Sequence, residues 1–220
     1  MTLDEFKAKK AADEEWAPGW DAIESVFNEL YPDQKPKHFA SNMANRAIFG
    51  GNEFLDGFSI YQSPNGYKHL VTYGMSQLYA DEKSFGGEFS KWGYEMTFKL
   101  KEDSIEDCMW AIDVLSNMAR YTYQTERWFE PYHYVAGNGT SIRLDKPECK
   151  ITALMVVADT EAEGLDTIYG RLDFIQFVGI TTEEINALKE GKISAEKLAK
   201  LIKADYPNLE TDMKRTHSYV

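Results

Sequence analysis

The sequence is poor in cysteine and has no long apolar run. Cys108 and Cys149 are the only cysteines among 220 residues. Two are too few for a disulfide framework or for a zinc site of several cysteines, so we expect both thiols to be reduced and structural. No run of about 18 apolar residues occurs, so no transmembrane helix is expected. Residues 1–15 mix acids with lysines and lack an apolar core, which argues against a secretory signal and indicates a cytoplasmic protein.

Basic residues are scarce relative to acidic ones. The chain has 24 Lys and Arg against 36 Asp and Glu, a formal net charge of −12. Phosphate contacts need clustered Lys and Arg, so nucleic acid is not an expected partner. The negative charge either serves solubility alone or also steers a basic partner, and both interpretations stay open.

Motifs for catalysis and for metal binding are missing as well. There is no G-x-S-x-G elbow, no P-loop and no dinucleotide-binding glycine pattern. The four histidines, His38, His69, His133 and His217, lack the short ligand spacing of zinc motifs. We therefore name no catalytic residue, expect no cofactor and no metal site, and predict that the protein is not an enzyme.

The strongest strand pattern lies in residues 68–100, which we interpret as two strands joined by a polar connection. Apolar and polar side chains alternate in the second strand, with Tyr94, Met96, Phe98 and Leu100 on one face and Glu95, Thr97 and Lys99 on the other. This alternation predicts one buried face and one face exposed to solvent. An earlier β run begins at Phe58, and the turn residues 63–66 predict a hairpin with the strand from Lys68. Gly50 and Gly51 predict a turn before that hairpin.

Further strands and helices follow from hydrophobic periodicity. Residues 151–157 form a nearly continuous apolar run, typical of a strand covered on both faces, and residues 169–180 predict another strand. Helices are predicted for residues 21–30 and 105–119, the latter with a capping box at Ser104 and with Cys108 in the core. Apolar residues at helical spacing in the second of these helices are Ile105, Cys108, Met109, Ile112, Leu115 and Ala119.

Two short helices are expected at the C-terminal end. Thr181 and Glu184 form a capping box for the first helix. The second should begin at Ser194 and bury Leu198, Leu201 and Ile202. Together these patterns predict an α+β fold, in which helices pack on a mostly antiparallel or mixed sheet. Residues 1–19 are interpreted as an N-terminal extension and residues 20–220 as a single domain.

Aromatic residues are unusually dense in residues 121–134. Such a cluster is typical of a binding surface, and core packing against the sheet explains it equally well. One hypothesis is therefore a small-molecule-binding protein or enzyme with an aromatic pocket lined by Tyr123, Trp128, Tyr132 and His133. Self-association through the same surface is a further alternative.

Six segments together resemble the Suppressor of fused family in the compact single-domain form known from bacteria. They are GGNEFLDGFSIY (50–61), LVTYGMSQLY (70–79), WGYEMTFKL (92–100), MARYTYQTERWF (118–129), LDFIQFVGITTEEI (172–185) and ETDMKR (210–215). These segments occur in the order that the family has, over residues 20–215. The resemblance implies an α+β fold and a non-enzymatic role in binding another protein.

The resemblance also implies a partner and a contact region. The bacterial members resemble immunity proteins that bind and neutralise polymorphic toxins, so we expect a protein partner, with a toxin encoded nearby as the candidate. In the animal member a second domain follows and helps to hold a transcription-factor peptide. This sequence ends where that domain would begin, so the same clamp is not expected. Tyr79 matches a family tyrosine of the peptide contact, and residues 80–90 match the loop after it. The expected partner-binding residues are Tyr79, Asp81, Glu82, Glu88 and Trp92.

Overall fold

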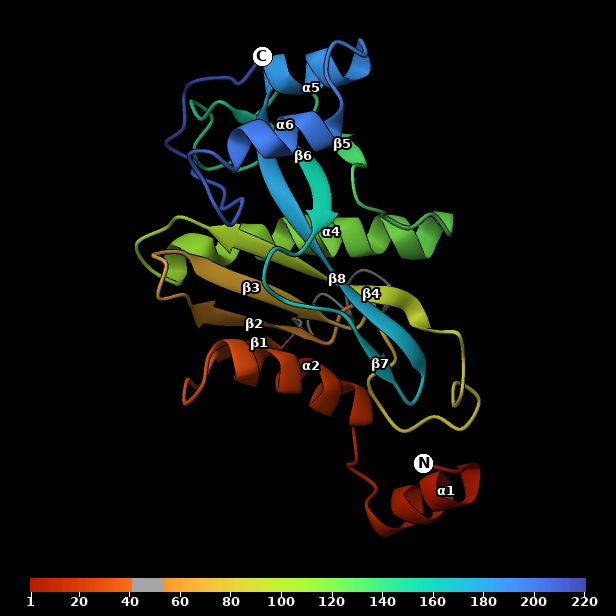
Figure 1. Cartoon of the computed structure of the whole chain (residues 1–220). Helices are drawn as coiled ribbons and strands as arrows, with labels where there is room; N and C mark the ends of the chain where they lie inside the picture. The colour runs from red at the N-terminus through yellow and green to blue at the C-terminus, as the bar shows by residue number, and fades with distance from the viewer. Residues whose placement is uncertain (41–53) are drawn as a thin grey trace.

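One mixed sheet of eight strands organises the molecule. The computed structural model describes residues 1–40 and 54–220. The strands follow the order β1-β2-β3-β4-β8-β6-β5, and β7 pairs with β8 outside this row (Figure 1). Their bounds are β1 (Lys37–Ala40), β2 (Gly57–Gln62), β3 (Lys68–Tyr73), β4 (Phe89–Leu100), β5 (Tyr134–Ala136), β6 (Ile151–Ala158), β7 (Leu165–Thr167) and β8 (Gly170–Thr181). Within the described sheet only β4 and β8 run parallel, which confirms the predicted α+β class.

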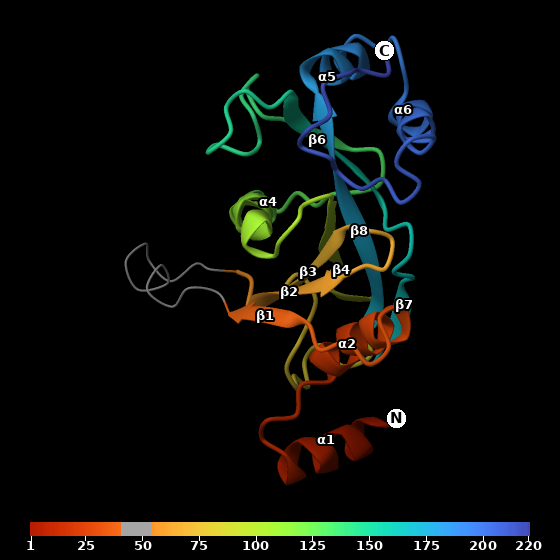
Figure 2. The ribbon, with the colours of Figure 1, turned by 90° about the vertical axis from the view of Figure 1, so that its left-hand side faces the viewer.

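Helices cover both faces of this sheet and one of its ends. They are α1 (Leu3–Ala12), α2 (Pro18–Leu30), α4 (Met109–Thr125), α5 (Thr182–Lys189) and α6 (Ala195–Ile202), with a 3₁₀ turn η1 (Glu106–Cys108) before α4. Figure 2 shows α4 on one face, α2 near the other, and α5 and α6 at the end far from α1. Three apolar clusters fill these layers, between the sheet and α4, between the sheet and α2, and between the strands β6 and β8 and the pair α5 and α6.

The polar face of β4 is buried, so the prediction that it would be exposed to solvent is wrong. Glu95, Thr97 and Lys99 each have 0% exposure, as do Met96 and Phe98 on the opposite face. The cause is that β4 lies between β3 and β8 in the middle of the sheet, with helices or loops over both faces. Alternation of polar and apolar residues identified the strand correctly but could not tell a solvated face from a hydrogen-bonded interior.

Most predicted elements are present near their expected bounds. The hairpin of β2 and β3 forms with Ile60 opposite Leu70, and β6 is buried over seven of its eight residues. Thr181 and Glu184 form the predicted capping box, in which each side chain bonds the other residue's backbone N–H. Two helix residues expected in the core are exposed instead, Met109 by 38% and Leu201 by 37%. The turn predicted at residues 50–51 lies outside the described residues.

The expected N-terminal extension contains a docked helix. The helix α1 begins with a Thr2 capping box and buries Phe6 completely. The Phe6 ring packs on Trp16, on Phe85 and on Tyr169, with ring centroids 5.1 to 6.3 Å apart. This contact attaches α1 to the connection between β3 and β4. Among the described residues, no helix is both long and apolar enough to cross a bilayer.

Candidate functional site

A buried polar network lies beneath the sheet face that α2 covers. Asp159 follows β6, and its carboxylate accepts a hydrogen bond from Lys99 Nζ at 2.9 Å and contacts His69 Nε2 at 3.0 Å. All three side chains have 0% exposure. Burial alone would raise the pKa of Asp159, but the neighbouring His69 and Lys99 hold that pKa well below its usual range. Because every charged group here has a partner and none is exposed, we interpret the network as structural.

Glu95 forms a second buried anchor, which fixes the turn after β3. Its carboxylate accepts hydrogen bonds from the backbone N–H groups of Gly74 and Ser76, both at 2.9 Å. It also accepts a 2.6 Å hydrogen bond from the Thr72 hydroxyl. Burial raises the pKa of Glu95, and these hydrogen bonds act in the opposite direction. Gly74 has a φ of +134°, and a Cβ there would lie 2.7 Å from the Phe54 carbonyl oxygen. The turn that leads to Tyr79 is therefore held from inside the sheet.

Tyr79 is exposed at the start of the connection of residues 80–90. Its side chain is 53% exposed, and its hydroxyl donates a hydrogen bond to the Asp56 carboxylate. The Tyr79 carbonyl accepts a hydrogen bond from the Tyr169 hydroxyl at 2.9 Å. The β7–β8 hairpin therefore supports the backbone of this connection while leaving the Tyr79 ring at the surface.

The acidic residues of the connection are held in different ways. The Asp81 carboxylate accepts a 2.7 Å hydrogen bond from the Ser84 hydroxyl, which lowers the pKa of Asp81. Glu82 lies 3.7 Å from Lys7 Nζ of α1, in an exposed ion pair. Glu88 is exposed, and its carbonyl accepts a hydrogen bond from the backbone of Arg171. Because α1 packs on this connection, part of the expected contact region is already covered within the chain.

Trp92 packs with Tyr123 of α4, away from these acidic residues. Their rings meet edge to face with centroids 5.5 Å apart, and the Tyr123 hydroxyl donates to the Gly74 carbonyl at 2.7 Å. Trp92 also lines an open cavity of about 970 Å³ together with Trp128. The structure therefore brings one residue of each predicted set, Trp92 and Trp128, to the walls of one cavity.

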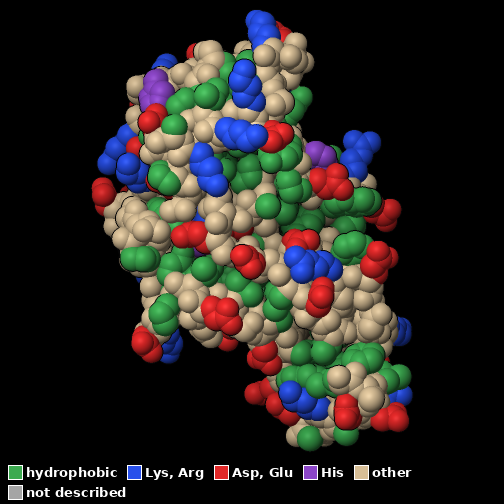
Figure 3. All heavy atoms as spheres, in the orientation of Figure 1, with side chains coloured by type: hydrophobic (Ala, Val, Ile, Leu, Met, Phe, Trp, Pro, Cys, Tyr) green, Lys and Arg blue, Asp and Glu red, His purple; other side chains and the backbone are tan. Residues whose placement is uncertain are grey.

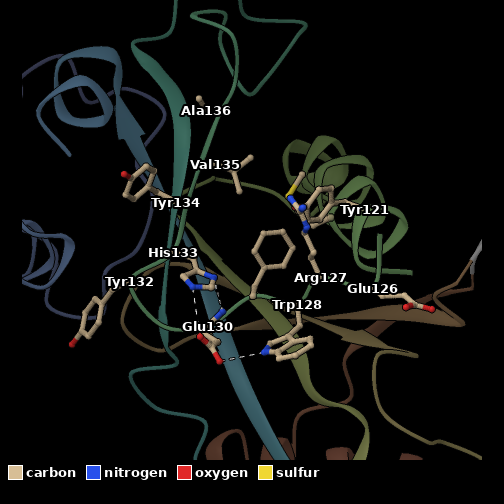
Figure 4. Close-up of a pocket in the computed structure, with 12 residues that line it drawn as sticks. Tyr121, Glu126, Arg127, Trp128, Glu130, Tyr132, His133, Tyr134, Val135 and Ala136 are labelled. Carbon is tan, nitrogen blue, oxygen red and sulfur yellow. Dashed lines mark hydrogen bonds and ion pairs between the residues drawn. The ribbon is translucent and has the colours of Figure 1, made fainter. Parts of the chain in front are cut away.

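The aromatic cluster of residues 121–134 is divided between core and surface. Phe129 is buried, whereas Tyr121, Trp128, Tyr132 and Tyr134 are 40 to 54% exposed. Trp128, Tyr132 and His133 of the aromatic set line an open cavity of about 860 Å³, but Tyr123 does not line it. Figure 4 shows the Glu130 carboxylate between Trp128 and His133, and the indole N–H of Trp128 donates to Glu130 at 3.2 Å.

A second open cavity continues this surface along α4. It has a volume of about 580 Å³ and shares Met118, Val135 and Ala136 with the first. Its other walls come from α4 and from the segment after β5, with Trp110, Val114 and Ile142 among the apolar residues. We call the two cavities together the α4–β5 groove. The part of this groove along α4 was not predicted, because its walls meet only when β5 pairs at the edge of the sheet.

No metal site accompanies these surfaces in residues 1–40 and 54–220, where no three His, Cys, Asp or Glu side chains gather to hold an ion. Both cysteines are free, with Cys108 buried and Cys149 half-buried. Sequence analysis also missed the buried network of Asp159 with His69 and Lys99. Polar residues of neighbouring strands that share one sheet face could have indicated this network. The alternation of polar and apolar residues alone predicts a solvent-exposed face instead.

Known proteins resemble this chain over nearly its whole length. Two curated relatives, each called Suppressor of fused homolog, from Homo sapiens and Mus musculus, are 31% identical over 212 residues. Each alignment covers 90% of this chain and 43% of the relative, so the chain spans less than half the length of these relatives.

Solved structures share the fold. A chain of the Sufu–Fu complex has a TM-score of 0.78 and 24% identity, with 91% of this chain and 92% of that chain covered. Drosophila Suppressor of Fused has a TM-score of 0.79 and 24% identity, with coverage of 92% and 51%. A putative homolog from Neisseria gonorrhoeae has a TM-score of 0.58 and 17% identity, with coverage of 92% and 98%. The family model described as Suppressor of fused protein (SUFU) matches residues 51–216. The chain therefore belongs to the Suppressor of fused family.

Proposed function

We propose that this chain is a non-enzymatic protein-binding module of the immunity type. In this proposal it binds a polymorphic toxin encoded by a neighbouring gene and neutralises it in the cytoplasm. Membership of a family in which one structure is described as the Sufu–Fu complex supports a protein partner. The toxin as partner rests on the resemblance to bacterial members of the family.

One observation carries the protein-binding function. Half of the twelve large apolar side chains that are exposed in the described chain gather around the α4–β5 groove. They are Met109, Tyr121, Trp128, Tyr132, Tyr134 and Leu144. Figure 3 shows apolar side chains in green beside β5 and the end of α4, with acidic side chains in red and basic ones in blue at the border. Apolar surface of this kind with a polar rim is typical of a protein-interaction site, and Tyr and Trp are enriched in such sites.

A second candidate function is the binding of a small molecule in the same place. It is favoured by the 860 Å³ cavity, which Trp128, Tyr132 and His133 line with the carboxylate of Glu130. This volume falls in the range of ligand sites. Crystals soaked with a fragment library would decide it, because a true ligand site should repeatedly hold fragments between Trp128 and His133. Fragments that bind elsewhere, or nowhere, would count against this candidate.

The main proposal is tested by co-expression with the product of the neighbouring gene. We expect the two proteins to co-purify in a fixed ratio, and cells that express the toxin-like product to survive only when this chain is present. Trp128→Ala and Tyr134→Ala should each weaken the complex at least tenfold, because buried aromatic anchors carry most of the binding energy of an interface.

The variant Tyr79→Ala distinguishes between the two predicted contact regions. The Tyr79 side chain is also about half exposed, but it lies beside the connection of residues 80–90 and not in the groove. We expect the variant to leave the complex unchanged if the α4–β5 groove is the binding surface. If the wild-type chain neither co-purified with the neighbouring gene product nor protected the cells, the proposed function would be contradicted.

A further inference from the structure

The strand β5 forms an edge of the sheet with unused backbone groups. It pairs with β6 on one side, with Val135 opposite Leu154. The His133 carbonyl and the Gly137 N–H both bond to β6. Residues of an antiparallel strand direct their backbone groups alternately to the two sides. The N–H and C=O groups of Tyr134 and Ala136 therefore point to the outer side, where no partner lies within residues 1–40 and 54–220.

This edge is exposed and lies directly beside the α4–β5 groove. Tyr134 and Ala136 are both exposed, and each lines the 860 Å³ cavity. The side chain of Val135 packs toward the core under α4. A strand added outside β5 would therefore place alternate side chains over the groove walls Met118 and Tyr121, and the others on the side of Tyr134. Backbone bonds would supply affinity, and the groove would select side chains.

The charge at the groove favours a basic occupant. Five carboxylates line it, those of Glu106, Asp113, Glu126, Glu130 and Asp145, against the guanidinium groups of Arg127 and Arg143. Glu106 already pairs with Lys37, at 3.0 Å. Of the two arginines, Arg143 is buried and already bonds Glu102 at 2.7 Å and Asp145 at 3.1 Å. Asp113 and Glu126 have no cationic partner among the described residues. Complementary charge steers and orients a partner, and the chain's net charge of −12 acts in the same direction.

We propose that the outer edge of β5 binds an extended segment of a partner protein that alternates basic and apolar residues. The segment adds to the sheet as a further strand beside Tyr134 and Ala136, with its basic side chains over the carboxylates of the α4–β5 groove and its apolar side chains on the side of Tyr134. This inference rests on the proposed protein-binding function and specifies its site and the chemistry of its partner.

The experiment uses a synthetic probe, a fluorescein-labelled, end-capped peptide of four Lys-Val repeats, and the full chain. Fluorescence anisotropy should show saturable binding that is at least tenfold tighter than binding of the matched peptide of four Glu-Val repeats. Ala136→Pro should lower the affinity for the Lys-Val peptide at least tenfold, because proline removes the outward N–H that the added strand needs. Proline at an edge position keeps the inward pairing with β6, and circular dichroism and thermal unfolding would verify that the variant is folded.

Matched variants separate the backbone from the side chains. Ala136→Gly changes the side chain at the same position but keeps the N–H, so it should bind within about twofold of the wild type. The double variant Asp113→Asn with Glu126→Gln should bind the Lys-Val peptide more weakly than the wild type does. Its affinity for the Glu-Val peptide should not fall. Amide hydrogen exchange at Tyr134 and Ala136 should slow when the Lys-Val peptide is bound.

Several outcomes would overturn the inference. These are no binding of the Lys-Val peptide to the wild type, equal binding of both peptides, or unchanged binding to Ala136→Pro. A wild-type dimer that becomes monomeric in Ala136→Pro would show that a second copy of the chain occupies the edge instead. If the neighbouring gene product still co-purifies with Ala136→Pro at full strength, the protein-binding function stands and only the edge site fails.

Discussion

Lys99 Nζ lies 2.9 Å from Asp159 Oδ1, and neither side chain is exposed to solvent. Lys99 comes from the middle of the sheet and Asp159 from the loop after β6, so this ion pair joins the loop to the central strand. Glu161 Oε2 lies 2.8 Å from the same Nζ. The loop therefore depends on a buried charge that water cannot replace without opening the structure.

Asp159→Asn should strongly destabilise the fold near neutral pH. The change leaves Lys99 with less compensation inside the protein, and breaking a buried pair costs about 3 to 5 kcal/mol. The pKa of Asp159 in the folded state lies below its unfolded value of about 3.9. Its contribution to stability is therefore present above about pH 4 and is lost as the pH falls toward the folded-state pKa.

Urea unfolding between pH 2.5 and 7 measures this prediction. The wild type should lose stability steeply below about pH 4, and Asp159→Asn should show a flatter curve that lies lower at pH 7. Asp166→Asn is the matched control, because the Asp166 side chain is 87% exposed. Equal stability of the two Asn variants at pH 7 would contradict the assigned role of the buried pair.

Glu95→Gln should loosen the turn that carries Tyr79. Both carboxylate oxygens of Glu95 accept hydrogen bonds, from Gly74 and Ser76 on one side and from Thr72 on the other. The amide group of Gln would turn an N–H₂ donor toward one of these donors, with an expected loss of about 1 to 3 kcal/mol.

Hydrogen exchange gives the local readout of that change. The amides of Gly74 and Ser76 should exchange faster in Glu95→Gln than the loss of global stability explains. Glu88→Gln, at an exposed glutamate of the neighbouring connection, should change neither the unfolding curve nor these amides. If the amides of Gly74 and Ser76 were equally protected from exchange in Glu95→Gln and in the wild type, Glu95 would not be the anchor of the turn.

The sequence predicted elements better than it predicted their surroundings. The alternation in β4 and the capping box at Thr181 depend on neighbours along the chain, and both were read correctly. The burial of Glu95 and Lys99 depends on Asp159 and on strands that lie far away in sequence. A local pattern carries no information on such partners, so the alternation wrongly predicts that the polar face of β4 is exposed to solvent.

The predicted contact residues illustrate the same limit. Trp128, Tyr132 and His133 lie close together in sequence and share a cavity. Tyr123 is equally close in sequence but points into the layer between α4 and the sheet, where Trp92 meets it. The free edge of β5 could not be predicted at all, because it arises from the order of strands in the finished sheet.

The two cysteines should differ sharply in reactivity. Burial raises the pKa of the Cys108 thiol to about 12. It also raises the pKa of Cys149, but that side chain is only half-buried and stays accessible. At pH 8 only about one Cys108 in ten thousand would be a thiolate, the form that attacks disulfides. In Ellman's assay the folded chain should therefore show one thiol, and the urea-unfolded chain two. Cys149→Ser should abolish the fast reaction, and rapid labelling of two thiols in the folded protein would show that Cys108 is accessible.

Phe6→Ala should release α1 without unfolding the rest of the chain. The Phe6 ring is fully buried among Trp16, Phe85 and Tyr169, and truncation of a buried Phe costs about 3 to 5 kcal/mol. Because the Phe6 cluster ties α1 to the rest of the described chain, this loss can appear as local opening rather than global unfolding.

Limited trypsin digestion detects that opening, since α1 contains Lys7, Lys9 and Lys10. A local loss of about 3 kcal/mol corresponds to a roughly hundredfold faster cleavage in α1, while the sheet stays resistant. Leu3→Ala is the matched control in the same helix, because Leu3 is 41% exposed and should not change the rate. Released α1 would also uncover Glu82 and the connection of residues 80–90, because Lys7 no longer lies against it. If Phe6→Ala is cleaved as slowly as Leu3→Ala, the Phe6 contact does not hold α1 in place.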